Sequence, residues 1–95
     1  MVRPRKKRSI AFNPLVTYYK PRGVPLSQLE EVVLTHDEME ALRLKNIEGL
    51  DQTACADKMT ISQSTFQRIL NAAYKKMSTA LIEGKAIKIE HTEQT

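Results

Sequence analysis

Apolar residues recur at spacings of three and four in two long stretches of the chain, which is the period of an amphipathic helix. The stripe in the first stretch, residues 35–50, is formed by Met39, Leu42 and Ile47, with Ala41 or Leu44 beside them. Thr35 and Glu38 have the spacing of a capping box, and Gly49 suits the left-handed residue that often ends a helix. The pattern therefore predicts a helix over about residues 36–48.

The second stretch predicts a short helix followed by a long one. Asp51 is placed to cap a helix over 52–59, and Ser62 to cap a longer helix over 63–82, which Gly84 would end. Thr60 and Ile61 would form the turn between them. The apolar stripe of the long helix consists of Phe66, Ile69, Leu70, Ala73, Met77, Ala80 and Leu81.

The flanking segments are better suited to extended structure. Residues 15–19 are rich in β-prone side chains between two prolines, and residues 86–90 alternate between apolar and polar, so both are expected to be short strands. They would pair with each other, either in the same chain or in a partner. Residues 27–34 fit a helical turn or an extended segment equally well.

The two helices around Thr60 fit a helix-turn-helix. Such a pair crosses steeply, which needs a small residue at the crossing and shared apolar positions around the turn. Ala56 is the small residue, and the shared core would be Cys55, Met59, Ile61, Phe66 and Ile69. The predicted fold class is mainly α: a helix-turn-helix core with an extended basic N-terminal arm, residues 1–9, and short flanking β-strands. Residues 10–95 would form a single domain.

The outer face of the long helix carries the candidate binding residues. At about 100° per residue, Ser64, Arg68, Asn71 and Lys75 fall within a stripe roughly 60° wide, and Gln63 and Gln67 flank it. The sequence has no acidic residue between Asp57 and Glu83, whereas an ordinary solvated face usually mixes Glu with Lys. The alternative remains that this face is an ordinary wet surface.

The residue types on this face suit nucleic acid. Arginine can form a forked pair of hydrogen bonds with guanine, glutamine and asparagine can do so with adenine, and serine or threonine can bond bases or phosphates. The free N–H groups at a helix start also attract phosphate. The candidate DNA-binding residues of the long helix and its cap are Ser62, Gln63, Ser64, Thr65, Gln67, Arg68, Asn71 and Lys75.

The charge is distributed unevenly along the chain. The formal net charge is +4, but residues 1–22 contribute +7, residues 23–60 contribute −5 and residues 61–95 contribute +2. The basic residues of the arm are Arg3, Arg5, Lys6, Lys7 and Arg8. We expect them to reach a DNA minor groove beside the long helix, or alternatively to form a tail that only aids solubility.

Other classes of function find little support in the residues. Cys55 is the single cysteine, and His36 and His91 have no metal-ligand partners at useful spacing, so neither a metal nor another cofactor is expected. Asp37, Glu38 and Glu40 are interpreted as helix-start and surface charge. No nucleophile–base pair or phosphate loop is visible, so the protein is not expected to be an enzyme. No apolar stretch is long enough for a membrane span, and a cytoplasmic, nucleoid-associated location is expected.

Three segments together resemble the DUF134 (UPF0251) family: "FNPLVTYYKPRGVP", "VVLTHDEMEALRLKNIEGLDQTACADKMTISQSTFQRIL" and "ALIEGKAIKIE". The resemblance covers about Arg3 to Glu90. It implies a DNA-binding helix-turn-helix similar to sigma-factor region 4, over Gln52 to Ile69, with Ser62–Arg68 opening the recognition helix. Thr60 occupies the turn position that the family usually fills with glycine. A left-handed conformation there would cost about 1 kcal/mol or more.

These observations predict a sequence-specific duplex-DNA-binding protein, a transcriptional regulator that reads the major groove with helix 63–82. A homodimer is expected because a single short recognition helix gives limited affinity and two-fold sites are the usual remedy. One alternative is an adaptor whose acidic helix 36–48 binds a protein of the transcription machinery, with only nonspecific nucleic-acid binding. RNA binding is a third possibility.

Overall fold

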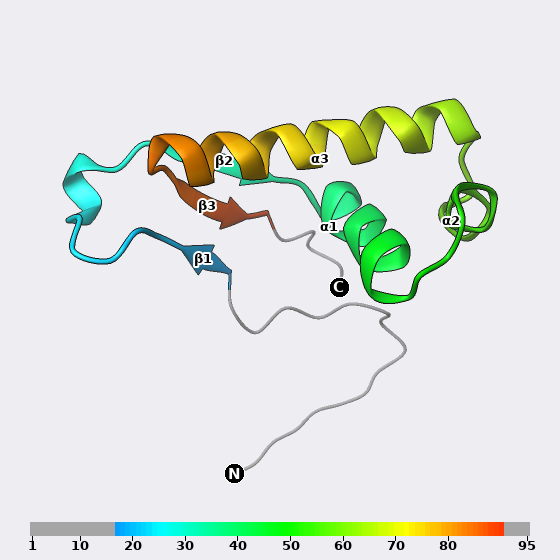
Figure 1. The fold of residues 1–95 in the computed structure, drawn as a ribbon, viewed down its shortest axis with the longest axis horizontal. Coiled ribbons are helices and arrows are strands. Elements are labelled where there is room, and N and C mark those ends of the chain that lie inside the picture. The colour runs from blue at the N-terminus through cyan, green and yellow to red at the C-terminus, as the bar shows by residue number, and fades with distance from the viewer. Residues whose placement is uncertain (1–16, 91–95) are drawn as a thin grey trace, which may run out of the picture.

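The computed structural model describes residues 17–90, and these are mainly helical with one small sheet (Figure 1). The strands are β1 (Tyr18–Tyr19), β2 (Glu31–Leu34) and β3 (Ala86–Ile89). The helices are α1 (His36–Leu42), α2 (Gln52–Met59) and α3 (Gln63–Glu83), with a 3-10 turn η1 (Leu26–Gln28) and a π-helical turn η2 (Arg43–Ile47). The mainly helical class with short strands is therefore confirmed for the described residues.

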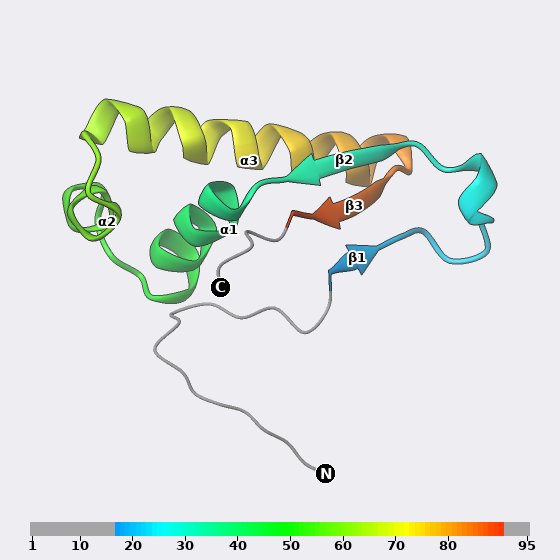
Figure 2. The ribbon, with the colours of Figure 1, turned by 180° about the vertical axis from the view of Figure 1, so that it is seen from behind.

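The three strands form one sheet in the order β1-β3-β2. The predicted pairing of the two flanking segments is confirmed within one chain: β1 runs antiparallel to β3, with Tyr18 opposite Lys88. β2 pairs in parallel on the other side of β3, so all three helices lie in the connection between these two strands. In both ribbon views α3 lies along this sheet, and its C-terminal half forms the second layer (Figures 1 and 2).

The segment 27–34, left open by the sequence, adopts both of the structures considered for it. It begins in the 3-10 turn η1 and continues as strand β2. The Tyr18 hydroxyl on β1 donates a hydrogen bond to Glu31 Oε2 on β2 at 2.6 Å, over the central strand. That bond to a carboxylate raises the pKa of Tyr18 above its ordinary value. The side chains of the two outer strands are thereby linked to each other.

The ends of the helices follow the predicted caps. Thr35 and Glu38 form the capping box at the start of α1, with Glu38 N–H donating to Thr35 Oγ1 at 3.1 Å and Thr35 N–H donating to Glu38 Oε1 at 2.9 Å. Asp51 caps α2 by accepting from the Ala54 N–H at 2.8 Å. Gly49 and Gly84 have φ angles of 74° and 72°, as expected for residues that end helices in the left-handed region.

The helix predicted over residues 36–48 is not a single α-helix, and one member of its predicted apolar stripe, Ile47, is wrong. After Leu42 the backbone widens into the π turn η2, in which the Glu48 N–H donates to the Arg43 carbonyl oxygen at 2.9 Å. The wider turn changes the direction of the side chains that follow it. Ile47 consequently lies 78% exposed, whereas Ala41 and Leu44 are buried and Leu42 packs against the core, as the stripe predicted.

The buried core joins α1, η2, α2 and the first half of α3. Its members are Ala41, Leu44, Cys55, Ala56, Phe66 and Leu70, with Met59, Ile61 and Ile69 partly buried against them. The shared core predicted around the turn is therefore confirmed. The Cys55 Sγ donates to the Leu50 carbonyl oxygen at 3.6 Å, and burial raises the pKa of this thiol.

Two further predictions about individual residues are wrong. Leu81 was expected in the apolar stripe of α3 but is 78% exposed, because the last turns of this helix pack on the sheet through Ala80. Glu38 was interpreted as helix-start and surface charge; it does cap the start of α1, but it is buried and not on the surface. The Lys76 Nζ on α3 donates to Glu38 Oε1 at 2.9 Å and to the Val33 carbonyl oxygen at 2.7 Å. One lysine thus ties α3 to the junction of β2 and α1.

Candidate nucleic-acid interface

The helices α2 and α3 meet at a three-residue turn, Thr60 to Ser62. Figure 1 shows α2 almost down its axis while α3 lies across the view, so the two helices cross steeply. Ala56 is buried in the core that the two helices share. Because its side chain is a single methyl group, the backbones can approach closely there.

Among the residues that the structure describes, Thr60 is the non-glycine residue with a positive φ; its backbone angles are φ 60° and ψ 47°. Its N–H donates to the Asp57 carbonyl oxygen at 3.1 Å, and the next N–H, of Ile61, donates to the Ala56 carbonyl oxygen at 3.0 Å. These two bonds form a Schellman motif, which usually has glycine at this position. The turn therefore keeps the geometry of a glycine turn, and threonine bears the strain of the left-handed conformation.

Replacing Thr60 with glycine should raise the free energy of unfolding by about 1 kcal/mol, because the β-branched side chain no longer strains the left-handed turn. Urea denaturation followed by circular dichroism measures the change. Thr53→Gly provides the matched control, since Thr53 is exposed within α2 and the lower helix propensity of glycine should instead cost roughly 0.3 kcal/mol. A loss of stability at Thr60 would contradict the strain assigned to this turn.

The start of α3 is organised by hydroxyl groups. Ser62 Oγ accepts from the Thr65 N–H at 3.1 Å and donates to Thr65 Oγ1 at 2.9 Å, and it lies 3.2 Å from Ser64 Oγ. The Gln52 side chain, which the sequence analysis did not single out, donates from α2 to the Gln63 carbonyl oxygen at 3.2 Å. In the sequence, the indication of this role was that Gln52 is a polar residue at the start of the preceding helix. The first turn of α3 is thus held from two sides.

The outer face of α3 has the exposure that its spacing predicted. Ser64, Arg68, Asn71 and Lys75 are all exposed, as are Ser62 and Gln63, whereas Thr65 and Gln67 are half-buried. Thr65 lies on the flank of the stripe, where its hydroxyl is 3.4 Å from an Arg68 terminal nitrogen that donates to it. The structure thus brings the predicted residues of the long helix together on one exposed surface, with Thr65 and Gln67 at its margins.

Gln67 and Asn71 already bond to each other on this surface. The Gln67 Nε2 donates to Asn71 Oδ1 at 3.0 Å, one helical turn apart. A forked contact with adenine needs both the oxygen and the nitrogen of one amide. While this hydrogen bond persists, the pair presents to a base one acceptor, the Gln67 side-chain oxygen, and one donor, the Asn71 side-chain nitrogen. The bond must break before either amide can form a forked contact.

The basic residues of the arm, Arg3, Arg5, Lys6, Lys7 and Arg8, lie outside the described residues, so the arm stays a prediction. His91 also lies outside them, and His36 is half-buried at the first position of α1. Within residues 17–90 no group of three or more His, Cys, Asp or Glu side chains is arranged to hold a metal ion. None of the helices in this range is both long and apolar enough to cross a membrane.

Comparison with known proteins relates the whole chain to one family. The family model described as "Protein of unknown function DUF134" matches residues 1–95. A UPF0251 protein of Caldanaerobacter subterraneus subsp. tengcongensis is 54% identical over 90 residues, which are 95% of this chain and 76% of that protein. A UPF0251 protein of Thermoanaerobacter sp. strain X514 is 53% identical over 90 residues, 95% of this chain and 80% of the relative.

The extent of the match differs among relatives. In a UPF0251 protein of Desulforudis audaxviator the same 90 residues, 54% identical, make up 59% of the relative's length. No solved structure matched the chain. The family model spans the whole sequence and the identities lie above half, so the chain belongs to the DUF134 (UPF0251) family.

Proposed function

We propose that this protein binds duplex DNA in a sequence-specific manner, as a transcriptional regulator, with α2 and α3 acting as a helix-turn-helix similar to sigma-factor region 4. The observation that carries the proposal is the exposed face of α3, on which Ser64, Arg68, Asn71 and Lys75 lie in one stripe with no acidic residue. Such a face carries no negative charge that would repel phosphates. An α-helix of this width fits the major groove of B-DNA.

Each side chain of this face has a role that suits its chemistry. Arg68 would read guanine through a forked pair of hydrogen bonds, and Gln63 and Gln67 would read adenine. Ser62, Ser64, Asn71 and Lys75 would mainly hold phosphates, supported by the N–H groups at the start of α3. Thr65 Oγ1 accepts a hydrogen bond from Arg68 and would orient the guanidinium toward the groove.

The structure gives less support to an adaptor that uses an acidic helix. Of the acidic side chains on α1 and η2, Glu38 is buried against Lys76, and Glu40 pairs with Arg43 at 2.9 Å. The carboxylate of Glu48, just after η2, pairs with the same arginine at 2.9 Å. These carboxylates are therefore engaged within the chain, which leaves a smaller acidic surface for a protein partner than the sequence implied.

Arg68→Ala should cost about 1–3 kcal/mol in binding to the preferred duplex and should relax specificity at one base pair. The preferred duplex is first obtained by selection from a random pool, and fluorescence anisotropy then measures the affinities. Arg68 is exposed, so its removal should leave the fold intact.

Two comparisons sharpen this experiment. Lys75→Ala removes a proposed phosphate contact, so it should weaken binding about equally on all sequences and reduce the salt slope by about one. Lys88→Ala removes an exposed lysine of the sheet and should change little. If Arg68→Ala weakened binding to every duplex equally, the base-reading role would be wrong. Stronger competition by structured RNA than by duplex DNA would point to RNA as the ligand.

A further inference from the structure

An apolar groove runs between the α1–η2 segment and α3, on a different side of α3 from the stripe of Ser64, Arg68, Asn71 and Lys75. It has a volume of about 410 Å³, and its apolar lining consists of Met39, Leu42, Ile47, Tyr74 and Met77. Ile47 is 78% exposed and Tyr74 38% exposed, although both are large and largely apolar. The π turn η2 is the reason that Ile47 lies on the rim of the groove instead of in the core.

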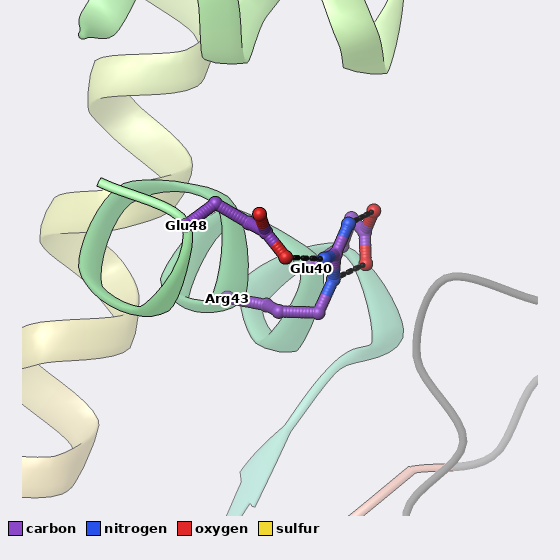
Figure 3. A network of polar contacts seen from close by, with 3 residues as sticks. All are labelled: Glu40, Arg43 and Glu48. Atoms are coloured by element: carbon purple, nitrogen blue, oxygen red, sulfur yellow. Dashed lines mark hydrogen bonds and ion pairs between the residues drawn. The ribbon is translucent and has the colours of Figure 1, made fainter. Parts of the chain in front are cut away.

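The polar side chains that line the groove are bonded within the chain. Asn46 Nδ2 donates to the Tyr74 hydroxyl oxygen at 3.0 Å, and this hydroxyl donates to Asn46 Oδ1 at 3.2 Å. Figure 3 shows Arg43 held between Glu40 and Glu48. Its Nε and one terminal nitrogen donate to Glu40 at 3.1 and 2.9 Å, and its other terminal nitrogen donates to Glu48 at 2.9 Å.

This pairing of charges narrows the choice of occupant. A small polar ligand is normally oriented by a few convergent polar groups, and those of this groove are already used. A strongly charged peptide would need several unpaired charges of opposite sign on the rim, whereas Arg43 offsets one of its two carboxylate partners and leaves this cluster with a net charge of only −1. An identical surface brings the same single net charge, on a rim where the Glu48 side chain is half exposed to solvent, so two copies meet with only weak, screened repulsion.

The groove and its rim are also complementary to each other. In a two-fold symmetric dimer each contact occurs twice, so one face must carry both the projection and the hollow that receives it. Ile47 projects from the rim of the groove that its own face provides. We infer that this face is a homodimer interface, in which Ile47 of each copy inserts between the α1–η2 segment and α3 of the other.

The size of the face predicts a weak dimer. Two helices side by side are about 20 Å wide, and the 12 residues of α1 and η2 extend over about 18 Å. The resulting projected area of roughly 360 Å² per partner lies below the about 500 Å² of accessible surface that each partner buries in a stable specific interface, so only a weak, transient dimer is expected. Leu81, exposed seven positions after Tyr74 on the same strip of α3, lines a separate hollow beside Tyr19 and Ile87, so it can contribute only at the edge of this face.

The dimer would leave both reading faces open. At about 100° per residue, the centre of the strip formed by Tyr74, Met77 and Leu81 lies about 120° around α3 from the centre of the polar stripe. The strip therefore does not overlap the stripe of Ser64, Arg68, Asn71 and Lys75. Gln63 and Gln67 do lie on the strip's side of α3, but Gln67 precedes Tyr74 by seven residues, about 10 Å along the helix axis, so one pair of chains could still present two recognition helices to two half-sites. The interface itself does not depend on DNA binding, so it can be tested in the absence of DNA.

The test is sedimentation velocity on the full chain, over a concentration series from about 1 μM to about 1 mM, which brackets a weak dimer. The wild-type protein should pass from monomer to dimer across the series. Ile47→Glu should weaken this association at least about tenfold, because two carboxylates would be brought into an apolar contact. Leu81→Glu should weaken it as well, to a smaller extent.

Ile82→Glu is the matched control. Ile82 is an equally exposed aliphatic residue, at 83%, but it lies outside this strip of α3, so its substitution should leave the association unchanged. A wild-type protein that stays monomeric at every concentration would overturn the inference. So would a dimer that Ile82→Glu disrupts as strongly as Ile47→Glu does. Loss of DNA binding in Arg68→Ala with dimerisation intact separates the two proposals.

Discussion

Replacing Phe66 with alanine should lower the free energy of unfolding by about 3–5 kcal/mol, which approaches the whole stability of a domain of this size. Phe66 is fully buried and is the largest side chain of the core that joins α1, α2 and α3. Its removal would leave a cavity that Ala41 and Ala56, as small neighbours, cannot fill. Urea denaturation of dilute protein, followed by circular dichroism, measures the loss.

Leu81→Ala is the control for this substitution. The two residues occupy the same predicted apolar stripe, but Leu81 is 78% exposed, so its removal should change the free energy of unfolding by no more than about 0.5 kcal/mol. Equal losses at the two positions would show that the C-terminal half of α3 is buried in solution. Phe66 anchors the start of α3, which carries Arg68, in the core. Unfolding caused by its substitution should therefore also abolish the proposed reading face.

The sequence predicted the elements whose formation depends on local chemistry. Helix starts at Thr35, Asp51 and Ser62 were predictable because each cap needs one side chain near its own backbone. The strands β1 and β3 were predictable from alternation and from the bracketing prolines. Their choice of partner, within one chain, depends on how α3 returns the backbone to β1, and local patterns do not contain this information.

The errors have a common origin in packing between distant segments. An α-helical wheel placed Ile47 in the core, but the π turn shifts every position after Leu42. The helical wheel of α3 correctly placed Phe66 and Leu70 in the core. It also placed Leu81 there, because a wheel does not show where α3 leaves the core formed with α1 and α2 and begins to pack on the sheet. The burial of Glu38 depends on Lys76, which lies 38 positions away in the sequence.

The candidate interface was more predictable than the core. Phe66 and Ala73 define the buried face of the first half of α3. The opposite face must then be exposed, and it carries Ser64, Arg68, Asn71 and Lys75. The hydrogen bond between Gln67 and Asn71 also has the spacing of one helical turn. The apolar groove could not be predicted, because its rim depends on the π turn and on a contact between Asn46 and Tyr74.

The second large effect should arise where β2, α1 and α3 meet. Glu38→Ala should lower the free energy of unfolding by about 2–4 kcal/mol, because it removes half of the capping box and leaves Lys76 without its carboxylate. Asp37→Ala is the matched control: Asp37 is exposed in the same turn, and its loss should cost at most about 1 kcal/mol.

A double-mutant cycle with Lys76→Met then separates the capping box from the ion pair. The Lys76 Nζ also donates to the Val33 carbonyl oxygen, so this substitution releases α3 from both β2 and α1. A coupling energy of about 1 kcal/mol or more between the two positions would show that the pair itself stabilises the junction. Additive losses would mean that Glu38 acts through the cap alone, and the placement of α3 would then rest on the apolar core around Phe66.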